Sequence, residues 1–187
     1  MIYRCEWSQK NENYSKYHDE EWGKPLHDDQ KLFEFLILEG MQAGLSWITI
    51  LKKREAFRIA YENFDVHKVA GFDQQKIEEL MSDSGIIRNR LKIEASINNA
   101  RRFLEVVEEF GSFDSYMWSF VDHQPIVNHW SKLSEIPAKT ELSDRISDDL
   151  KRRGFKFVGS TIIYSHLQAT GVINDHLVSC FCHPDNH

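Results

Sequence analysis

The spacing of apolar residues along the chain predicts a series of helices. Apolar positions recur every three or four residues after His27-Asp28-Asp29, where an aspartate supplies a helix N-cap. Ile93, Ile97 and Leu104 mark a long amphipathic helix that ends near Gly111. The other helices are expected over 46–61, 66–70, a segment capped by Asp73, 113–120, a basic segment from Ser143 or Asp144 to Gly154, and 159–170.

The remaining segments carry no helical pattern of this kind. Residues 1–27 look irregular, and 121–142 read as a loop that contains two prolines. Near the C-terminus, Asn174 or Asp175 is expected to cap a final turn or two over 176–181. No stretch alternates convincingly with period two, so the chain is predicted to be all-α.

The most apolar stretch runs from Leu32 to Leu51, and Glu34 and Glu39 are its only charges. The polar residues within and after it favour a buried core helix over a membrane span. A buried carboxylate needs a partner, because burying it unpaired is costly. Pairing with an arginine or capping a helix end is the commoner explanation for such a glutamate.

Two glycines follow Glu39 closely, and each weakens a helix by roughly 1 kcal/mol relative to alanine. Gly40 and Gly44 therefore suggest a backbone that something approaches closely. Trp47 lies just beyond them, and from the residues alone plain core is the commoner role for it. The stretch raises the question of what Glu39 holds and what Trp47 covers.

Composition and charge narrow the class of protein. The 187 residues suit one domain, or one domain with a satellite, and 41% are hydrophobic, which suffices for a core. The net charge of −6 argues mildly against a nucleic-acid partner, although the basic residues cluster at 52–54, 88–92, 101–102 and 151–156. Solvated helix faces are the commoner explanation for any one such cluster. The polar N-terminus, without a secretory leader, and the three cysteines fit a reducing cytoplasm.

Cysteines and histidines near both ends suggest a metal site. His176 and Cys180 stand four positions apart, so a helix would place both on one face. With Cys5 and His18 they would make a four-ligand set of the kind that structural zinc prefers. Cys182 and His183 are rival ligands. On spacing alone, small buried cysteines and surface histidines are the commoner explanation.

The segment 83–90 is a tight connection between two predicted helices. Gly85 can adopt a positive φ, and exposed backbone N–H groups there could hold a phosphate oxygen at the start of the next helix. Arg88, Asn89, Arg90 and Lys92 would add side-chain donors. This is how a helix–hairpin–helix element grips a DNA backbone, but an ordinary helical hairpin with solvated charges fits the turn equally well.

Together, these stretches resemble the bacterial 3-methyladenine DNA glycosylase I family of the helix–hairpin–helix glycosylase superfamily. The resemblance covers essentially the whole chain. The motifs that carry it are Arg4-Cys5-Glu6-Trp7, Tyr17-His18-Asp19-Glu20-Glu21-Trp22-Gly23, the run from Leu38 to Trp47, Gly85-Ile86-Ile87-Arg88-Asn89-Arg90, Trp118-Ser119-Phe120-Val121, the run from Arg153 to Gly159, and the run from Gln168 to His176.

The resemblance implies a role for individual residues. Cys5, His18, His176 and Cys180 match the family's structural zinc ligands, one ion per chain. Glu39 matches its base-recognising glutamate. Tyr17 and Trp47 match its pocket aromatics, with Trp7, Tyr14 and Trp22 nearby. Gln42 and Leu45 fall in its DNA-inserting loop, and Gly85, Ile87, Arg88, Arg90 and Lys92 belong to its hairpin at 83–92.

The resemblance also implies an organisation and an activity. Residues 1–27 and 160–187 would form a zinc-stapled terminal region, residues 28–159 a helical domain, and the pocket would lie between them. The expected activity is monofunctional excision of 3-methyladenine from alkylated double-stranded DNA by base flipping, carried out by a monomer in the cytoplasm. No lyase step is expected, because the long helix after the hairpin carries no aspartate. A non-catalytic DNA-binding module and, more weakly, a zinc hydrolase are the alternatives.

Overall fold

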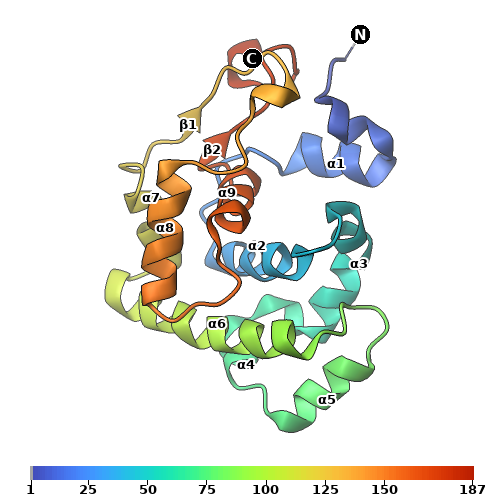
Figure 1. The fold of residues 1–187 in the computed structure, drawn as a ribbon, viewed down its shortest axis with the longest axis vertical. Coiled ribbons are helices and arrows are strands. Elements are labelled where there is room, and N and C mark those ends of the chain that lie inside the picture. The colour runs from blue at the N-terminus through green and yellow to red at the C-terminus, as the bar shows by residue number, and fades with distance from the viewer. Residues whose placement is uncertain (1) are drawn as a thin grey trace.

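The computed structural model describes residues 2–187, and this part of the chain is mostly helical (Figure 1). The helices are α1 (Glu12–Glu20), α2 (Asp29–Gln42), α3 (Trp47–Ala60), α4 (Val66–Ala70), α5 (Gln74–Ser82), α6 (Arg90–Phe110), α7 (Phe113–Ser119), α8 (Glu141–Arg152) and α9 (Ser160–Ala169). Short 3-10 turns cover Glu6–Lys10, Glu62–Phe64, Leu133–Glu135 and Pro184–Asn186. Two strands, β1 (Ile126–Val127) and β2 (Ile173–Asn174), pair in parallel.

Side-chain caps explain why most helices begin where the sequence predicts. The side chains of Asp28, Asp73 and Asn89 each accept a hydrogen bond from the backbone N–H three residues later, at the start of α2, α5 and α6. Helix α8 begins at Glu141, slightly earlier than expected, because Thr140 is its N-cap. The helices predicted from residue 28 to residue 170 are confirmed, apart from boundaries of this kind.

Both terminal segments differ from the predictions. Residues 1–27 were expected to be irregular, but α1 forms there, and the Asn11 side chain caps it by accepting from the Tyr14 N–H. The helical turn expected over 176–181 is absent from the described residues. Its backbone bonds to other parts of the chain instead, since the Val178 N–H donates to the Trp130 carbonyl and the Phe181 N–H donates to the Tyr3 carbonyl.

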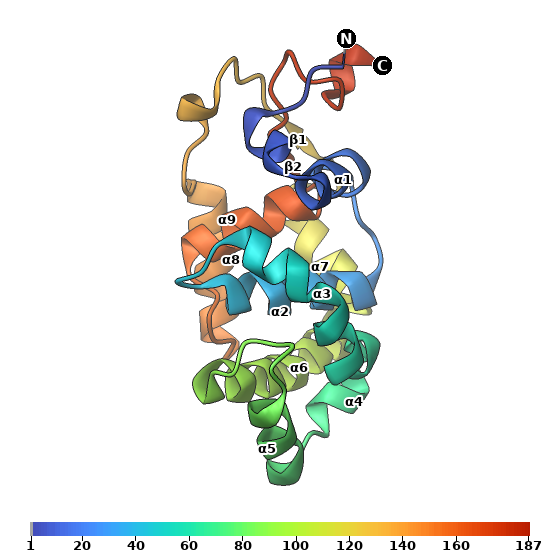
Figure 2. The same ribbon diagram turned by 90° about the vertical axis from the view of Figure 1, so that its right-hand side faces the viewer.

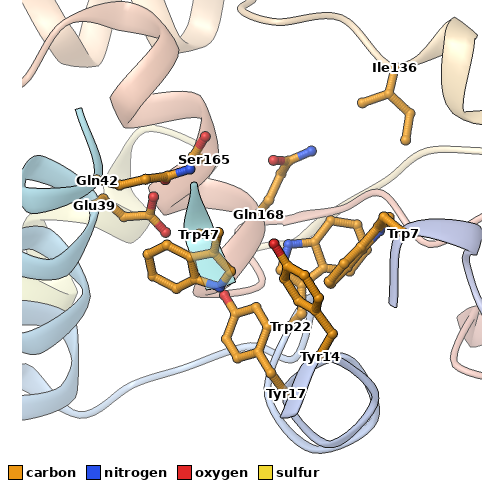
Figure 3. A pocket seen from close by; sticks show the side chains of 10 residues that line it. All are labelled: Trp7, Tyr14, Tyr17, Trp22, Glu39, Gln42, Trp47, Ile136, Ser165 and Gln168. Carbon is orange, nitrogen blue, oxygen red and sulfur yellow. The ribbon is translucent and has the colours of Figure 1, made fainter. Parts of the chain in front are cut away.

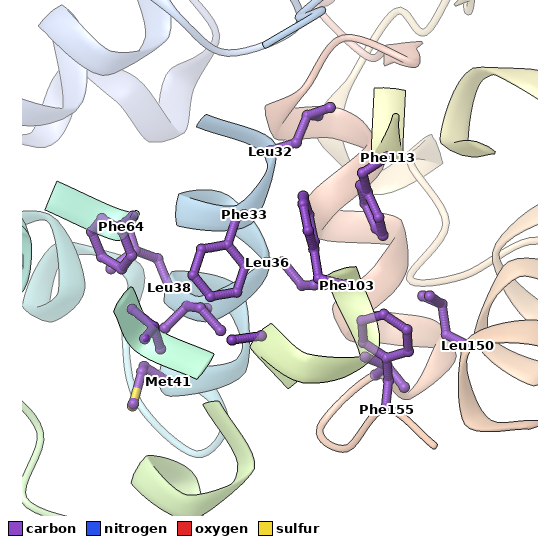
Figure 4. Close-up of a cluster of buried hydrophobic side chains, with 14 of the residues drawn as sticks. Leu32, Phe33, Leu36, Leu38, Met41, Phe64, Phe103, Phe113, Leu150 and Phe155 are labelled. Atoms are coloured by element: carbon purple, nitrogen blue, oxygen red, sulfur yellow. The ribbon is translucent and has the colours of Figure 1, made fainter. Parts of the chain in front are cut away.

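Helix α2 lies at the centre of the main core, which explains its apolar sequence. It packs against α3, α6, α7 and α9, and its residues from Leu32 to Met41 are all buried (Figure 4). Phe33, for example, meets Phe103 of α6 edge to face, with the ring centroids 5.2 Å apart. A helix covered on several sides has no broad polar face, so α2 carries a near-continuous apolar run.

The two ends of the chain meet at one end of the molecule, opposite α5 (Figures 1 and 2). A second, smaller apolar cluster lies there and contains Cys5, Tyr17, Trp22, Leu177 and Cys180. No helix within residues 2–187 is both long enough and apolar enough to cross a membrane.

Gly171 lets the turn after α9 pack directly against the backbone near residue 24. Its φ is +70°, and a Cβ there would lie 2.1 Å from the carbonyl carbon of Lys24. We expect Gly171→Ala to lower the free energy of unfolding by more than about 3 kcal/mol, because backbone strain and an immovable clash add together. Gly111→Ala is the matched control, since its φ is +86° but no atom lies within 4 Å of the new Cβ. Urea unfolding that gave equal losses for both variants would contradict this account.

Candidate functional site

A pocket of about 260 Å³ opens between α1, the start of α3 and the end of α2 (Figure 3). Its volume lies just below the range of about 300–1,000 Å³ that is usual for drug-sized ligands, which suits a single flat heterocycle. Four aromatic residues near the N-terminus and one from α3 form much of the wall. The lining residues are Trp7, Tyr14, Tyr17, Trp22, Glu39, Gln42, Trp47, Ile136, Ser165 and Gln168.

Glu39 supplies the only carboxylate of the pocket lining. Only 4% of the residue is exposed, and within residues 2–187 no hydrogen bond or ion pair reaches its carboxylate. Burial alone raises the pKa of Glu39 to about 8. The commoner explanation for a buried glutamate, pairing with arginine, instead describes Glu34 on the same helix, which accepts from Arg54 at 3.0 Å and Arg58 at 2.8 Å.

The aromatic side chains surround the space in front of this carboxylate. The rings of Tyr17 and Trp47 lie 5.6 Å apart, and Trp7 lies 5.6 Å from Tyr14 and 5.0 Å from Trp22. The indole Nε1 of Trp47 is buried and has no acceptor within the described residues. Electron-rich ring faces and a carboxylate both attract a cation, so the pocket is suited to a flat cationic ring with hydrogen-bond donors on its edge.

Three lining residues were not predicted. Ile136 lies in the long loop and Ser165 on α9, and neither position carries a sequence pattern that marks it. Gln168 lies in the run from Gln168 to His176, for which the resemblance implies a role only at His176. Its Nε2 donates to Asp175 Oδ2 at 2.9 Å, which fixes the orientation of the amide at the pocket wall.

The four predicted metal ligands come together from opposite ends of the sequence. One donor atom from each of Cys5, His18, His176 and Cys180 lies within 4.8 Å of the others, and all four residues are buried. Cys180 Sγ is 3.4 Å from His18 Nε2 and 3.6 Å from His176 Nδ1, and Cys5 Sγ is 3.8 Å from His176 Nδ1. Tetrahedral zinc with ordinary Zn–S and Zn–N bonds separates S from N by roughly 3.6 Å, so the residues fit a metal.

The outer nitrogens of the two histidines strengthen this fit. His18 Nδ1 is 2.8 Å from Asp19 Oδ1, and His176 Nε2 donates to the Trp22 carbonyl at 2.8 Å. These partners leave the inner nitrogen of each ring with a free lone pair, as in metal sites generally. His176 and Cys180 meet across an irregular loop, not on the helix that their spacing suggested.

The rival ligands lie outside this group. Cys182 donates its backbone N–H to Cys180 Sγ, while its own Sγ is 4.0 Å from His18 Nδ1, the outer nitrogen. His183 lies instead with His129 and Asp185.

The predicted DNA-contacting residues divide into two groups around the α2–α3 and α5–α6 connections. Gln42 lines the pocket, and Leu45 is 41% exposed in the loop after α2. Gly44 has a φ of +78° with open space around it. A Cβ added to Gly40, in contrast, would lie 3.5 Å from the Cβ of Phe157. The close approach at Gly40 is therefore made by the chain itself.

The α5–α6 connection differs in detail from the expected phosphate grip. Gly85 does not have a positive φ, and it is needed because a Cβ there would lie 2.9 Å from that of Ala56. The Gly85 N–H donates to Asp83 Oδ1, so it is not free for a ligand. The Ile87 and Arg88 N–H groups form no hydrogen bond within the described residues, and the Arg88 side chain is exposed.

The two remaining cations of this connection are already engaged. Arg90 pairs with Glu78 at 2.7 Å. Lys92 is only 8% exposed and donates to the carbonyls of Met41 and Ala43, so its ammonium is not presented to a ligand.

Comparisons with known proteins agree with this geometry. The chain is 52% identical over 183 residues to DNA-3-methyladenine glycosylase 1 of Escherichia coli (strain K12), which covers 98% of each chain. It is 48% identical over 182 residues to DNA-3-methyladenine glycosylase of Haemophilus influenzae, covering 97% of this chain and 98% of the relative. A solved variant of 3-methyladenine DNA glycosylase I in complex with 3-methyladenine superposes with a TM-score of 0.94 at 38% identity, covering 97% of each chain. The model of the methyladenine glycosylase family matches residues 7–183. The chain therefore belongs to the methyladenine glycosylase family.

Proposed function

We propose that the protein is a monofunctional DNA glycosylase that removes 3-methyladenine from alkylated double-stranded DNA. The single observation that carries this proposal is the buried, unpaired carboxylate of Glu39 at the head of an aromatic pocket. Curated relatives at 52% and 48% identity bear the name of this activity. Membership of the family and the chemistry of the pocket thus lead to the same substrate.

A base within a duplex is out of reach, so the damaged nucleotide must be flipped out of the stack. While it is attached to the sugar, 3-methyladenine carries a positive charge spread over its ring. The faces of Tyr17 and Trp47 would stack on that ring, and Glu39 would accept hydrogen bonds from its amino edge. Where the bound base displaces water from the pocket, each attraction is stronger than in bulk solvent.

The reaction needs little acid or base assistance. The bond from the sugar C1′ to the base breaks, its electron pair neutralises the cationic ring, and 3-methyladenine leaves as a neutral base. Water adds to C1′ and loses a proton. The proposed reaction is hydrolysis alone, without a Schiff-base lyase step. Glu39 acts here as a recognition and electrostatic group that favours positive charge.

The DNA would be held by the connection between α2 and α3 and the connection between α5 and α6. Gln42 borders the pocket and Leu45 is exposed in the loop beside it, which supports the proposal that these two side chains fill the gap left by the flipped base. The free N–H groups of Ile87 and Arg88, just before α6, would hold a backbone phosphate, with the Arg88 guanidinium adding charge. We call residues 43–46 the wedge loop and residues 83–89, the part of the expected hairpin that precedes α6, the hairpin.

Zinc is the metal that suits the Cys2His2 group, and its proposed role is structural. Four protein ligands leave no position for a reacting water, so the ion would supply cross-linking and no chemistry. It would tie residues 1–27 to 160–187 as a terminal region against the helical domain of 28–159. The pocket would lie between the two, since its lining draws on both.

The test is release of free base from methylated DNA by the purified, metal-loaded protein. We expect 3-methyladenine to be released well above the spontaneous rate, with 7-methylguanine as the comparison base in the same DNA. Binding to alkylated DNA without any base release would favour the alternative of a non-catalytic DNA-binding module.

A further inference from the structure

The carbonyl groups at the C-terminal end of α2 require donors, because the last four carbonyls of a helix have no partner within it. The Gly40 carbonyl accepts from the Ala43 N–H, and the Gln42 carbonyl accepts from the Leu45 N–H. The two carbonyls between and after them, those of Met41 and Ala43, both accept from Lys92 Nζ, at 2.9 Å and 2.6 Å. One lysine thus supplies the donors for two carbonyls at the base of the wedge loop.

Lys92 comes from the first turn of α6, directly after the hairpin. Its own backbone N–H donates to the Asn89 side chain, which caps α6. The side chain then runs inward, and burial lowers the pKa of Lys92 while the carbonyls hold its ammonium at the negative end of α2. The lysine therefore joins the α6 end of the hairpin to the wedge loop and to the helix that carries Glu39.

We propose that Lys92 is a positioning residue that fixes the wedge loop relative to the hairpin, so that gripping the DNA backbone and filling the vacated stack occur in one geometry. This inference rests on the proposed function. It assigns Lys92 a role different from contact with a phosphate, because a cation that is 8% exposed and bound to two carbonyls cannot approach DNA without giving up both bonds.

Lys92→Met tests the proposal, since methionine keeps the length of the side chain and removes both donors. We expect single-turnover base release from methylated duplex DNA to fall roughly 10- to 100-fold, because a wedge loop without its hydrogen bonds to Lys92 misplaces the flipped nucleotide. In single-stranded DNA the flipped base leaves no gap in a duplex that must be filled. Release from methylated single-stranded DNA should therefore change less than about threefold, as should binding of free 3-methyladenine.

The salt dependence of DNA binding separates positioning from phosphate contact. A lost phosphate contact lowers the slope of log K against log[salt] by about 0.9, whereas the proposal expects no change in Lys92→Met. Arg88→Gln, which removes an exposed cation of the hairpin, is the comparison for a lost contact and should lower the slope. Lys151→Gln, on α8, controls for the loss of one surface charge.

Equal losses on duplex and single-stranded DNA, or a lower salt slope in Lys92→Met, would overturn the proposal. If Lys92→Met does not bind free base, Lys92→Gln is measured in its place; its shorter amide can still donate to one carbonyl, and the same duplex-selective loss is expected. A wild-type protein that released no base would refute the proposed function itself. Full base release by wild type and by both variants would refute only the role of Lys92.

Discussion

Replacing Glu39 with glutamine should slow release of 3-methyladenine by roughly 100-fold while making the protein more stable at alkaline pH. The loss of rate follows because a hydrogen bond to a charged group contributes about 1.5–3 kcal/mol, and each 1.4 kcal/mol is about tenfold in rate. Glutamine fills the same space, but it cannot offer a negative charge to the cationic ring. Single-turnover assays on methylated DNA measure the effect.

The pH dependence of the reaction should change as well. The pKa of Glu39 is about 8 in the free protein, so the carboxylate that favours the cation forms mainly above that pH. We expect kcat/KM of the wild type to rise with pH and level off above about 8, since kcat/KM reports groups of the free enzyme. The profile of Glu39→Gln should lack this rise.

The contribution of Glu39 to stability changes with pH in the opposite direction to that of a salt-bridged carboxylate, which stabilises the folded protein at high pH. The unfolded chain releases the Glu39 proton near its ordinary pKa, while the folded protein keeps it until about 8. Wild-type stability relative to the variant is therefore fully present at low pH and falls as pH rises between these values, by up to about 1.4 kcal/mol per pH unit. Urea unfolding of both proteins at several pH values measures the difference.

Glu34→Gln is the matched control on the same helix. Glu34 pairs with Arg54 and Arg58, so its replacement should destabilise the protein by about 1–3 kcal/mol at pH 8 and leave the rise in kcat/KM in place. If Glu39→Gln also lost stability at pH 9, or kept the wild-type pH profile, the carboxylate would be paired in solution. The role assigned to it would then be wrong.

The contrast between Glu34 and Glu39 shows where sequence reasoning reached its limit. The apolar run identified both as unusual, but the partners of Glu34, Arg54 and Arg58, lie on α3, and the Glu39 carboxylate has no partner within the described residues. Helical spacing and caps depend on neighbouring residues, which is why the helices from α2 to α9 could be predicted. The presence or absence of a partner for a buried charge depends on tertiary packing, which a single sequence does not display.

The terminal segments and Lys92 show the same limit. Residues 176–181 form an irregular loop because their N–H groups bond to residues far away in the chain, although their spacing suggested a helix. Lys92 was grouped with the cations of the hairpin because of its position in the sequence. Its side chain turns inward because α2 ends beside it with two carbonyls that lack donors. The lining residues Ile136 and Ser165 carried no pattern at all.

Removing the metal should lower the free energy of unfolding by more than Glu39→Gln raises the free-energy barrier of the reaction. Metal analysis is expected to give about one zinc per chain, and Cys180→Ala should reduce it to near zero. Structural zinc contributes about 10–16 kcal/mol of apparent binding free energy, which is comparable to the whole stability of a domain of about 5–15 kcal/mol. Chelation should therefore unfold at least the terminal region, with a large change in tryptophan fluorescence.

The pocket should be lost together with the metal. His18 and His176 lie against Trp22, whose ring is 4.7 Å from that of His176, and Trp22 in turn contacts Trp7. Binding of free 3-methyladenine should consequently disappear on chelation and return when zinc is restored. Cys182→Ser is the matched control, since its Sγ lies 4.0 Å from the outer nitrogen of His18 and is not one of the four grouped ligands, and it should keep one zinc per chain. A metal content near zero in the wild type, or equal loss of zinc in Cys182→Ser and Cys180→Ala, would contradict the proposed ligand set, because only one of the two thiols lies within the four-ligand group.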